Sequence, residues 1–326
     1  MKAEILSLLR ETEGYLSGQE LCERFGVTRA AVWKAVGSLK KEGYEIEAVQ
    51  NKGYRLTGLP EVLSENELKS RIHTEWAGRE VAFYESVGST NVQAKLLAEE
   101  GAGHGTLVVA EAQTAGRGRR GRGWQSPPGI NLYFTLLLRP DFLPDKASML
   151  TLVMALSVKE AVAQVCGVES GIKWPNDIVL NGKKITGILT EMSLQGEYIQ
   201  HVVIGVGINV KKQEFAPELL DKATSLEAES GNTVSRALLL QRIMERFEAN
   251  YQIFTETFDL SKLSEPYNAG LVNCNKEVRV LDPAGEYTGL AKGINDKGEL
   301  LVQTPDGKLC EVYAGEVSVR GIYGYV

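Results

Sequence analysis

Residues 116–124 read GRGRRGRGW, a run in which four arginines are spaced by four glycines and followed by a tryptophan. Glycine lets the backbone adopt positive φ and brings amide groups close to an anion, while arginine supplies a planar fork of donors for the same oxygens. Standing alone, such a run is also typical of a disordered basic patch. Its flanks, GTLVVAE at 105–111 and INLYFTLLL at 130–138, are apolar and of strand length. The sequence therefore predicts an anion-binding loop between two core strands.

Length and composition indicate a globular protein with two or three domains. The chain has 326 residues, of which 43% are apolar, and a net charge of −6, so any nucleic-acid contact must be local. Four scattered cysteines and three histidines without ligand spacing argue against disulfides, a protein-bound metal and a histidine-based triad. No apolar run approaches the ~20 residues that span a bilayer, and the N-terminus lacks a signal-peptide core. We therefore expect a cytoplasmic protein that contacts no membrane.

The first sixty residues follow the plan of a winged helix-turn-helix. Apolar spacing over 17–41 indicates two helices around a tight turn, and Thr28 suits the N-cap of the second. Residues 44–56 then alternate apolar and polar side chains around Asn51-Lys52-Gly53, which is typical of a hairpin. An ordinary amphipathic helical hairpin would share only the first pattern. We therefore expect a DNA-binding domain at the N-terminus.

The second of these helices is expected to enter the major groove. Its apolar positions, Val32, Val36 and Leu39, would turn the opposite face outward, although Trp33 could also pack inward. The side chains expected at DNA are Thr28, Arg29, Trp33, Lys34 and, from the wing, Lys52 or Arg55. Through residue 60 the chain carries nine basic and eight acidic residues, a net charge of +1. Because this is weak for one copy, we expect a homodimer to read two half-sites.

A mixed pattern of strands and helices begins after a short linker at 58–64. The apolar segments are VAFYESV, GTLVVAE, INLYFTLLL, KITGILTEM and HVVIGVGINV, with a long apolar helix expected at 147–165. This pattern predicts an α/β domain built on a substantial sheet.

Three motifs in that domain favour a ligand site. Ser89-Thr90-Asn91 opens a helix, where it serves either as a plain N-cap or as a receptor for a carbonyl or carboxylate. The segment 173–177, KWPND, is either a simple turn or a strand end that presents Lys173 to a carboxylate or phosphate. Residues 205–209, GVGIN, permit close backbone approach, but they lack the third glycine and the helix of a Rossmann motif.

Taken together and in this order, STN, the arginine loop, KWPND, GILTE and GVGIN resemble the biotin protein ligases. With the winged helix in front, the chain is similar over essentially its whole length to the bifunctional biotin protein ligase/biotin operon repressor (BirA) family. The resemblance implies an α+β multidomain fold, with a winged helix-turn-helix at 1–63, a class II synthetase-like α/β ligase domain at 64–270 and an SH3-like β-barrel at 271–326. Short alternating segments separated by turns fit the last domain.

The resemblance also implies roles for individual residues. The biotin ring would be held by Ser89, Thr90, Asn91 and Gln113, and covered by Arg117, Gly118 and Arg119. Lys173 would meet the biotin carboxylate and the α-phosphate and, with Arg119, would act in catalysis. The adenylate would also contact Arg122, Trp124 and Asn209.

The implied activity joins biotin to ATP, with magnesium, and passes biotin from biotinyl-5'-AMP to a lysine of biotin carboxyl carrier protein. The adenylate would also act as corepressor, since the bound form would dimerise and bind operator DNA while the carrier competes for the same surface. One rival is a lipoate or octanoyl ligase, which the DNA reader and the arginine loop disfavour. Another is a ligand-sensing transcription factor without catalysis, which Lys173 and Arg119 disfavour.

Overall fold

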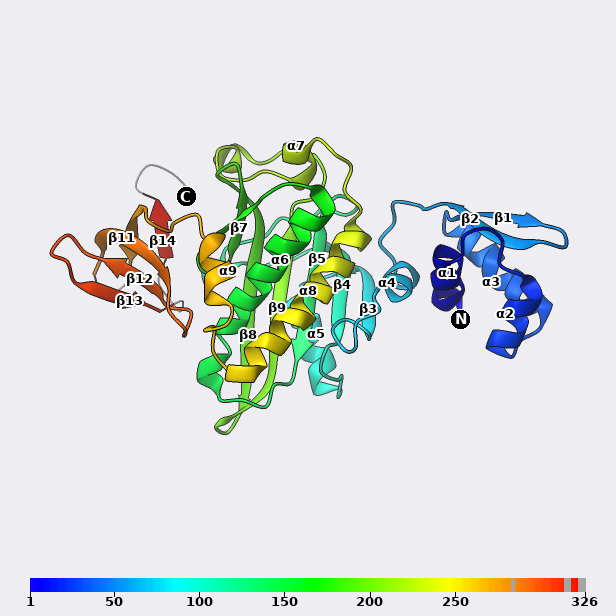
Figure 1. The fold of residues 1–326 in the computed structure, drawn as a ribbon, viewed down its shortest axis with the longest axis horizontal. Helices are drawn as coiled ribbons and strands as arrows, with labels where there is room; N and C mark the ends of the chain where they lie inside the picture. Colours follow the sequence, from blue (N-terminus) through cyan, green and yellow to red (C-terminus); the bar gives the residue numbers. More distant parts are fainter. Residues whose placement is uncertain (283–284, 314–317, 322–326) are drawn as a thin grey trace.

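The computed structural model describes residues 1–282, 285–313 and 318–321. Figure 1 shows three parts in a row along the longest axis: a small helical unit with a two-stranded sheet, a large sheet flanked by helices, and a second small sheet. The N-terminal unit and the C-terminal sheet therefore lie at opposite ends of the central part. The multidomain α+β organisation follows the prediction, while the domain limits at residues 63 and 270 stay predictions.

The N-terminal unit has the helices and wing that the sequence predicts. Its elements are α1 Lys2–Glu11, α2 Gly18–Phe25, α3 Arg29–Lys41, β1 Glu45–Val49 and β2 Gly53–Gly58. The Thr28 hydroxyl accepts a hydrogen bond from the Ala31 amide at 3.3 Å, which confirms its place as N-cap of α3. Leu16 pairs with Tyr54 beside the wing, and a Cβ on Gly53 would lie 2.1 Å from the Leu16 carbonyl oxygen. Glycine is therefore required there, and its φ of 114° adds to that requirement.

The central part is built on a seven-stranded sheet in the order β3-β4-β5-β9-β8-β7-β6. Its strands are β3 Val81–Val87, β4 Leu107–Gln113, β5 Leu132–Leu138, β6 Gly171–Lys173, β7 Asp177–Leu180, β8 Lys183–Gln195 and β9 Tyr198–Ile208. Strands β3 and β4 are parallel, and every other neighbouring pair is antiparallel. All five predicted strand segments are present, and the predicted turn at Asn181-Gly182 joins β7 to β8.

Helices cover both faces of this sheet. On one face α5, Thr90–Glu99, packs against β4, β5 and β9, and its Ala94 contacts a small core with Val108. Side chains alternate across a strand, so Leu107 and Val109 belong to the larger core on the other face. Helices α6, Met149–Cys166, and α8, Arg236–Thr257, cross that face in Figure 1. The shorter helices are α4 Glu65–Arg71, α7 Leu226–Ser230 and α9 Ser264–Ala269, with 3₁₀ turns at Arg119–Gly121, Pro144–Lys146 and Pro217–Leu219.

Helix α6 confirms the long apolar helix, which was predicted at 147–165. The expectation that no apolar run reaches membrane-spanning length was wrong, because residues 144–166 meet that length and composition, with a mean hydropathy of 1.5. Twelve residues of α6 are buried, and the helix packs between α8 and the sheet. Its apolar character is therefore explained by its place in the core, as expected of a helix that is hydrophobic all round.

The C-terminal part is a five-stranded antiparallel sheet in the order β13-β12-β11-β10-β14. Its strands are β10 Glu277–Leu281, β11 Tyr287–Ile294, β12 Leu300–Gln303, β13 Leu309–Val312 and β14 Ser318–Gly321. Within the described ranges no pairing joins β13 to β14, so the sheet is not closed. The β-rich C-terminal domain is as predicted, whereas closure into a barrel is not confirmed.

Candidate active site

Five polar side chains meet where the first turn of α5 crosses the sheet. They form a cluster, here called the buried polar cluster, made of Thr90, Asn91, Gln113, Thr135 and Glu191. Gln113 Oε1 accepts from the Thr90 amide at 2.9 Å, and Asn91 Nδ2 donates to Glu191 Oε2 at 2.7 Å. The Thr135 hydroxyl lies 2.7 Å from Asn91 Oδ1 and 2.8 Å from Thr90 Oγ1. Since Thr90, Asn91 and Thr135 are at most 5% exposed, these bonds hold one arrangement of donors and acceptors.

Glu191 gives this cluster a negative charge. Burial alone would raise its pKa, but hydrogen bonds from Lys95 and Asn91 outweigh burial and hold the pKa of Glu191 below its ordinary value. The Lys95 ammonium donates to Glu191 Oε1 at 2.7 Å. An ionised Glu191 is an acceptor only, which orients the Asn91 amide with its nitrogen toward the carboxylate.

A neighbouring glycine makes room for this arrangement. A Cβ on Gly205 of β9 would lie 2.0 Å from Asn91 Oδ1, so no side chain fits there while Asn91 keeps its place. Ser89 lies at the N-cap of α5, and its side chain makes no capping bond to the described residues. The Ser89 side chain thus does not act as a plain cap, and its expected contact with a ligand stays a prediction.

The arginine loop, residues 116–123, lies between β4 and β5, as the sequence predicts. It stands at the edge of the buried polar cluster. Backbone bonds give it a folded form: the Gly118 amide donates to the Arg122 carbonyl at 2.7 Å, and the Trp124 amide donates to the Gly116 carbonyl at 2.9 Å. Arg117, Arg120 and Arg122 are exposed, whereas Arg119 is half-buried. A compact array of cations therefore stands beside the cluster.

Arg119 connects the loop to the KWPND segment. Its Nη1 donates to Asn176 Oδ1 at 3.0 Å, while Asn176 Nδ2 donates to the Ile188 carbonyl of β8 at 3.1 Å. Burial lowers the pKa of Arg119, and the charge of Asp177 opposes that shift. Asp177 Oδ1 accepts from Lys184 Nζ at 2.6 Å. The arginine loop and the KWPND segment, whose contacting residues are 57 apart in sequence, thus form one charged surface, here called the charged wall.

Lys173 lies at the end of β6, where its backbone pairs in register with Asp177. Lys173 is only 6% exposed, as expected for a lysine directed into the protein at a strand end. Trp174 follows Lys173 in the chain and is joined to Pro175 by a cis peptide bond. It donates its indole N–H to the Gly298 carbonyl at 3.0 Å. That bond ties the lysine-bearing turn to the C-terminal domain.

Trp124 lies flat on two glycines of the sheet. A Cβ on Gly207 would lie 2.5 Å from the indole ring, and one on Gly187 would lie 3.0 Å from it. Lys184 Nζ stands 5.4 Å from the ring centroid, within cation–π range. The Trp124 indole nitrogen is buried and has no hydrogen-bond partner in the described part of the chain. This indole forms an aromatic platform next to the charged wall.

Asn209 stands at the end of β9 and is 7% exposed. Its Nδ2 donates to the Thr224 carbonyl at 3.0 Å, so the side chain already holds the loop before α7. A second buried amide, Asn131, accepts at Oδ1 from the Val210 amide at 3.0 Å. GVGIN thus ends on an anchored amide, and the expected contact of Asn209 with adenine stays a prediction.

The predicted DNA-reading face is exposed as expected. Arg29, Ala30, Trp33 and Lys34 all lie on the surface of α3, and Trp33 is 71% exposed, so it points outward. In the wing, Lys52 Nζ and the Arg55 guanidinium lie 5.7 and 5.0 Å from the Tyr15 ring centroid. These wing cations lie over a tyrosine that the sequence did not single out.

Several residues of the site were missed from sequence. Thr135 has a usable signal, since it is the one small polar residue within the apolar strand LYFTLLL, whose other hydroxyl belongs to the aromatic Tyr133. Arg236 has none, because its partner Glu111 lies 125 residues away in sequence, and Lys184 has none, because a lysine seven residues after an aspartate is an ordinary spacing. Arg236 is 5% exposed, and its Nη1 and Nη2 reach the two Glu111 oxygens at 2.8 and 2.9 Å. It thereby holds the strand that carries Gln113.

No protein-bound metal site emerges from the described residues, where no group of three or more His, Cys, Asp and Glu side chains is placed to hold an ion. The site instead combines the cations of the arginine loop and the KWPND segment, the buried polar cluster, and the aromatic platform of Trp124. Such a set suits a substrate that combines a polar ring, a carboxylate and a nucleotide.

Comparison with known proteins gives a consistent result for all three parts. The Biotin/lipoate A/B protein ligase family matches residues 84–209, an HTH domain matches residues 2–55, and the biotin protein ligase C terminal domain matches residues 274–320. The chain is 42% identical to the bifunctional ligase/repressor BirA of Bacillus subtilis, over 94% of both proteins. It is 35% identical to the biotin--[acetyl-CoA-carboxylase] ligase of Paracoccus denitrificans, over 68% of this chain and 92% of that protein.

A solved structure resembles the central and C-terminal parts. The biotin protein ligase from Aquifex aeolicus in complex with biotin and ATP superposes with a TM-score of 0.66 at 33% identity, over 74% of this chain and 99% of that chain. The named relatives are ligases of biotin, which goes against the lipoate or octanoyl alternative considered from sequence.

Proposed function

The chain belongs to the bifunctional ligase/repressor BirA family, and we propose that its two activities are divided between the site on the seven-stranded sheet and the winged helix. As a member, it activates biotin with ATP, transfers biotin to a lysine of a carboxylase carrier protein and represses transcription of the biotin operon. The proposal concerns which side chains carry each step.

The buried polar cluster is the proposed biotin ring site. The ring's urea group needs both donors and acceptors, and those are the groups that Ser89, Thr90, Asn91 and Gln113 bring to the N-terminus of α5. Arg117, Gly118 and Arg119 would fold over the ring from the arginine loop. Preorganised polar groups of this kind discriminate strongly, because a ligand without matching groups leaves them unpaired.

The adenylate is proposed to lie over Trp124. The indole supplies a stacking surface for adenine, and Asn209 and Arg122 would contact the base edge and the phosphate. Lys173 would reach both the biotin carboxylate and the α-phosphate from the end of β6. Magnesium would arrive with the ATP phosphates, in keeping with its preference for phosphate and water ligands.

The chemistry requires that two anions meet. A biotin carboxylate oxygen attacks the α-phosphorus, a P–O bond forms, and the bond to pyrophosphate breaks. Lys173 and Arg119 would offset the repulsion and stabilise charge that grows on the phosphoryl oxygens. In the second step the carrier lysine attacks the acyl carbon and AMP leaves, so the enzyme needs no nucleophile of its own. The folded loop would also keep water from the mixed anhydride.

One observation carries this assignment: the Arg119 bond to Asn176, 3.0 Å long. It joins the arginine loop to the segment that carries Lys173, and Asn176 in turn bonds to β8, the strand that carries Glu191 of the buried polar cluster. A basic loop that bound only nucleic acid would not be expected to make this side-chain bond to the KWPND turn.

Replacing Arg119 tests the assignment. Arg119→Gly should release biotinyl-5'-AMP about 10- to 100-fold faster and label bystander lysines, since a charge-assisted contact is worth about 1.5–3 kcal/mol. Arg120→Gly is the matched control, because Arg120 lies in the same loop at φ 57°, a conformation that glycine accepts. Release is measured with radiolabelled adenylate and labelling with serum albumin. Retention as tight and selective as in the parent protein would contradict the loop's role.

The winged helix is the proposed operator reader. Thr28, Arg29, Trp33 and Lys34 of the α3 surface would face the major groove, with Lys52 or Arg55 at phosphate. We further propose that the adenylate-bound form is a homodimer, that the domains divide at 63 and 270, that the last one is an SH3-like barrel, and that the protein is cytoplasmic. Deleting residues 1–63 should abolish operator binding and leave some ligation, and a gel shift by the truncated protein would contradict the assigned reader.

A further inference from the structure

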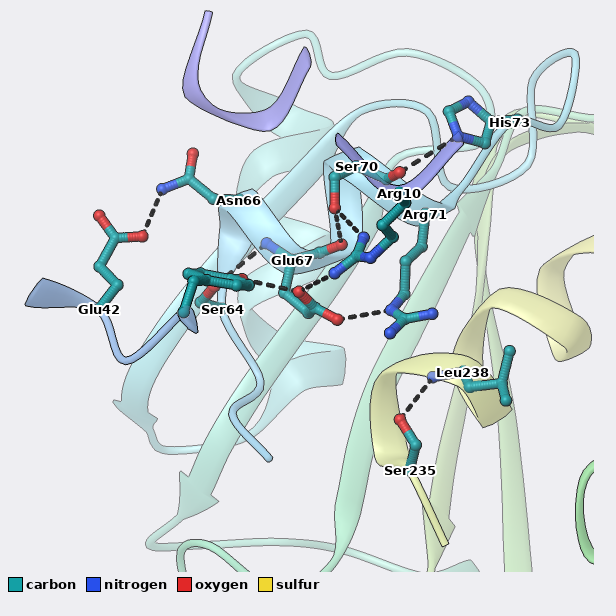
Figure 2. Close-up of polar contacts among 11 residues, drawn as sticks. Arg10, Glu42, Ser64, Asn66, Glu67, Ser70, Arg71, His73, Ser235 and Leu238 are labelled. Atoms are coloured by element: carbon teal, nitrogen blue, oxygen red, sulfur yellow. Dashed lines mark hydrogen bonds and ion pairs between the residues drawn. The ribbon is translucent and has the colours of Figure 1, made fainter. Parts of the chain in front are cut away.

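The winged helix meets the central domain through a charged group that is almost closed to solvent. Glu67 of α4 is 2% exposed, and its two oxygens bond to different arginines. Arg10 of α1 donates to one oxygen, and Arg71 Nε donates to the other at 2.5 Å. The Tyr44 hydroxyl donates to the oxygen that Arg10 uses, at 2.7 Å. We call these four residues the Glu67 cluster, and Figure 2 shows Glu67 between the two arginines.

The cluster's members come from both sides of the domain contact. Arg10 and Tyr44 belong to the winged helix, where Tyr44 packs in that domain's own core. Glu67 belongs to the ligase side, because α4 contacts α8 and β3, and its Leu68 lies in the core of the central domain. The carboxylate therefore joins two bodies that have separate cores.

Weaker contacts surround this cluster. Asn66 Nδ2 donates to Glu42 Oε2 at 3.1 Å (Figure 2), and the Ser7 hydroxyl lies 3.3 Å from His73 Nε2. These outer side chains are partly exposed, and polar pairs of that kind contribute little because water competes for both partners. Arg10 also donates to the hydroxyl of Ser70, which is 2% exposed, so the buried bonds from Arg10 to α4, with the Glu67 carboxylate as the charged partner, most restrict the angle between the domains.

A buried ion pair gives geometric definition more readily than stability. Desolvation offsets much of its Coulombic gain, yet all of its bonds are satisfied in one arrangement only. Any tilt of the winged helix would separate Arg10 and Tyr44 from the carboxylate, which would keep only Arg71 of its own helix. A dimeric repressor needs this kind of definition, because the two recognition helices must fall one helical turn, or a multiple of it, apart on DNA.

We propose that Glu67 is a positioning residue for operator binding, which fixes the angle of the winged helix to the ligase domain and thereby the half-site spacing that the dimer reads. This inference rests on the proposed reading of DNA by a homodimer. The carboxylate takes no part in ligation, since it lies on α4, between the DNA reader and the ligase domain.

The test compares Glu67→Gln with a matched control on the same helix. Glu65→Gln removes an equal charge from a carboxylate that is 51% exposed and pairs with Lys69, four residues along α4. Sites are first selected for the parent protein from a randomised duplex library, with biotin and ATP present. The selected half-sites are then placed at spacings that differ by single base pairs, and affinity is measured at each spacing for every variant.

We expect the parent and Glu65→Gln to prefer one spacing sharply, with about tenfold loss when it changes by two base pairs, which equals about 1.4 kcal/mol. Glu67→Gln should bind that optimum about tenfold more weakly and show a nearly flat profile, with the rate of biotin transfer within about twofold of the parent. A mere loss of stability would lower binding at all spacings alike and slow ligation too.

A sharp, parent-like profile for Glu67→Gln would overturn the inference while leaving the proposed repressor intact. If the parent selects no DNA, both the reader assignment and the inference fail. Should Glu67→Gln also lose ligation, the double variant Arg10→Gln, Tyr44→Phe decides, because it removes both contacts that the winged helix makes to Glu67 and leaves the Glu67–Arg71 pair in place. A sharp profile for this double variant would likewise overturn the inference.

Discussion

The buried polar cluster and the arginine loop lie side by side, yet they are held in opposite ways. Thr90, Asn91 and Thr135 are nearly inaccessible and bond to one another through side chains. The loop is held by its own backbone, and three of its four arginines are exposed. One region has its groups fixed before a ligand arrives, whereas the other can be ordered by the ligand itself.

This difference suits the two demands of the reaction. Discrimination of the biotin ring needs donors and acceptors that cannot adapt to other molecules. Retention of a reactive adenylate, followed by its delivery to a carrier, needs a cover that closes and opens again. Changes in the cluster should therefore have large effects on recognition, and backbone changes in the loop that leave its arginines in place should have small effects on retention.

The largest effect is expected from Gly205→Ala. Its new Cβ would lie 2.0 Å from Asn91 Oδ1, so Asn91 must leave its place in the buried polar cluster. Overpacking of this kind costs about 1–3 kcal/mol, and we expect biotin affinity to fall about 100-fold, near the upper end of that range. Calorimetry of biotin binding measures it. Gly103→Ala is the control, since a Cβ at Gly103 meets nothing within 4 Å. Unchanged biotin affinity in Gly205→Ala would mean that the cluster is not the ring site.

Next in size is Gly207→Ala, which acts on the aromatic platform. The added Cβ would lie 2.5 Å from the Trp124 indole and displace it. We expect the KM for ATP to rise about 10- to 30-fold, from about 2 kcal/mol of lost stacking, with biotin affinity preserved. The same substitution at Gly187, where the contact is 3.0 Å, should give a smaller rise in the same direction. Equal loss of biotin and ATP affinity would contradict separate subsites.

Thr135→Val should have an intermediate effect. The change keeps the shape of the side chain but removes the hydroxyl that lies 2.7 Å from Asn91 Oδ1. An unpaired buried acceptor costs about 1–3 kcal/mol, so both the free energy of unfolding and biotin affinity should fall, the latter about tenfold. Urea denaturation and calorimetry measure the two quantities. Thr57→Val on the exposed wing provides the control; if the two variants were equally stable, the cluster would not be rigid.

Much of the fold was predictable because its signals are local. Thr28 caps α3, Asn51-Lys52-Gly53 turns the wing, and glycine-bounded apolar runs became β4 and β5. The loop, STN and KWPND were also found from residue type and spacing alone. Their convergence on one site was implied only by resemblance, since no local pattern states which sheet edge they share.

The parts that were missed depend on contacts that form only in the folded chain. Lys184 is one of many lysines until β7 and β8 bring it to Asp177, and Glu67 is an ordinary helical glutamate until α1 packs on α4. For helix α6, the expectation that no apolar run reaches membrane-spanning length was wrong. The composition of the helix taken alone allows either a membrane span or a core helix. Burial decides between these readings, and burial is a property of the assembled fold.

The smallest effect should come from the loop, where Gly121 and Gly123 form a matched pair. Gly121 lies at φ 69°, whereas Gly123 has no such requirement, and a Cβ at either position meets nothing within 4 Å. Gly121→Ala therefore strains the folded loop by about 1 kcal/mol without any clash and should speed adenylate release about fivefold, while Gly123→Ala should release it at the parent's rate. The free energy of unfolding should hardly change in either variant, because the loop is exposed. A release rate that did not distinguish the two variants would mean that the loop's backbone form is not the form that retains the adenylate. If Gly121→Ala instead impaired biotin binding as severely as Gly205→Ala, the distinction between a fixed cluster and an adaptable loop would be lost.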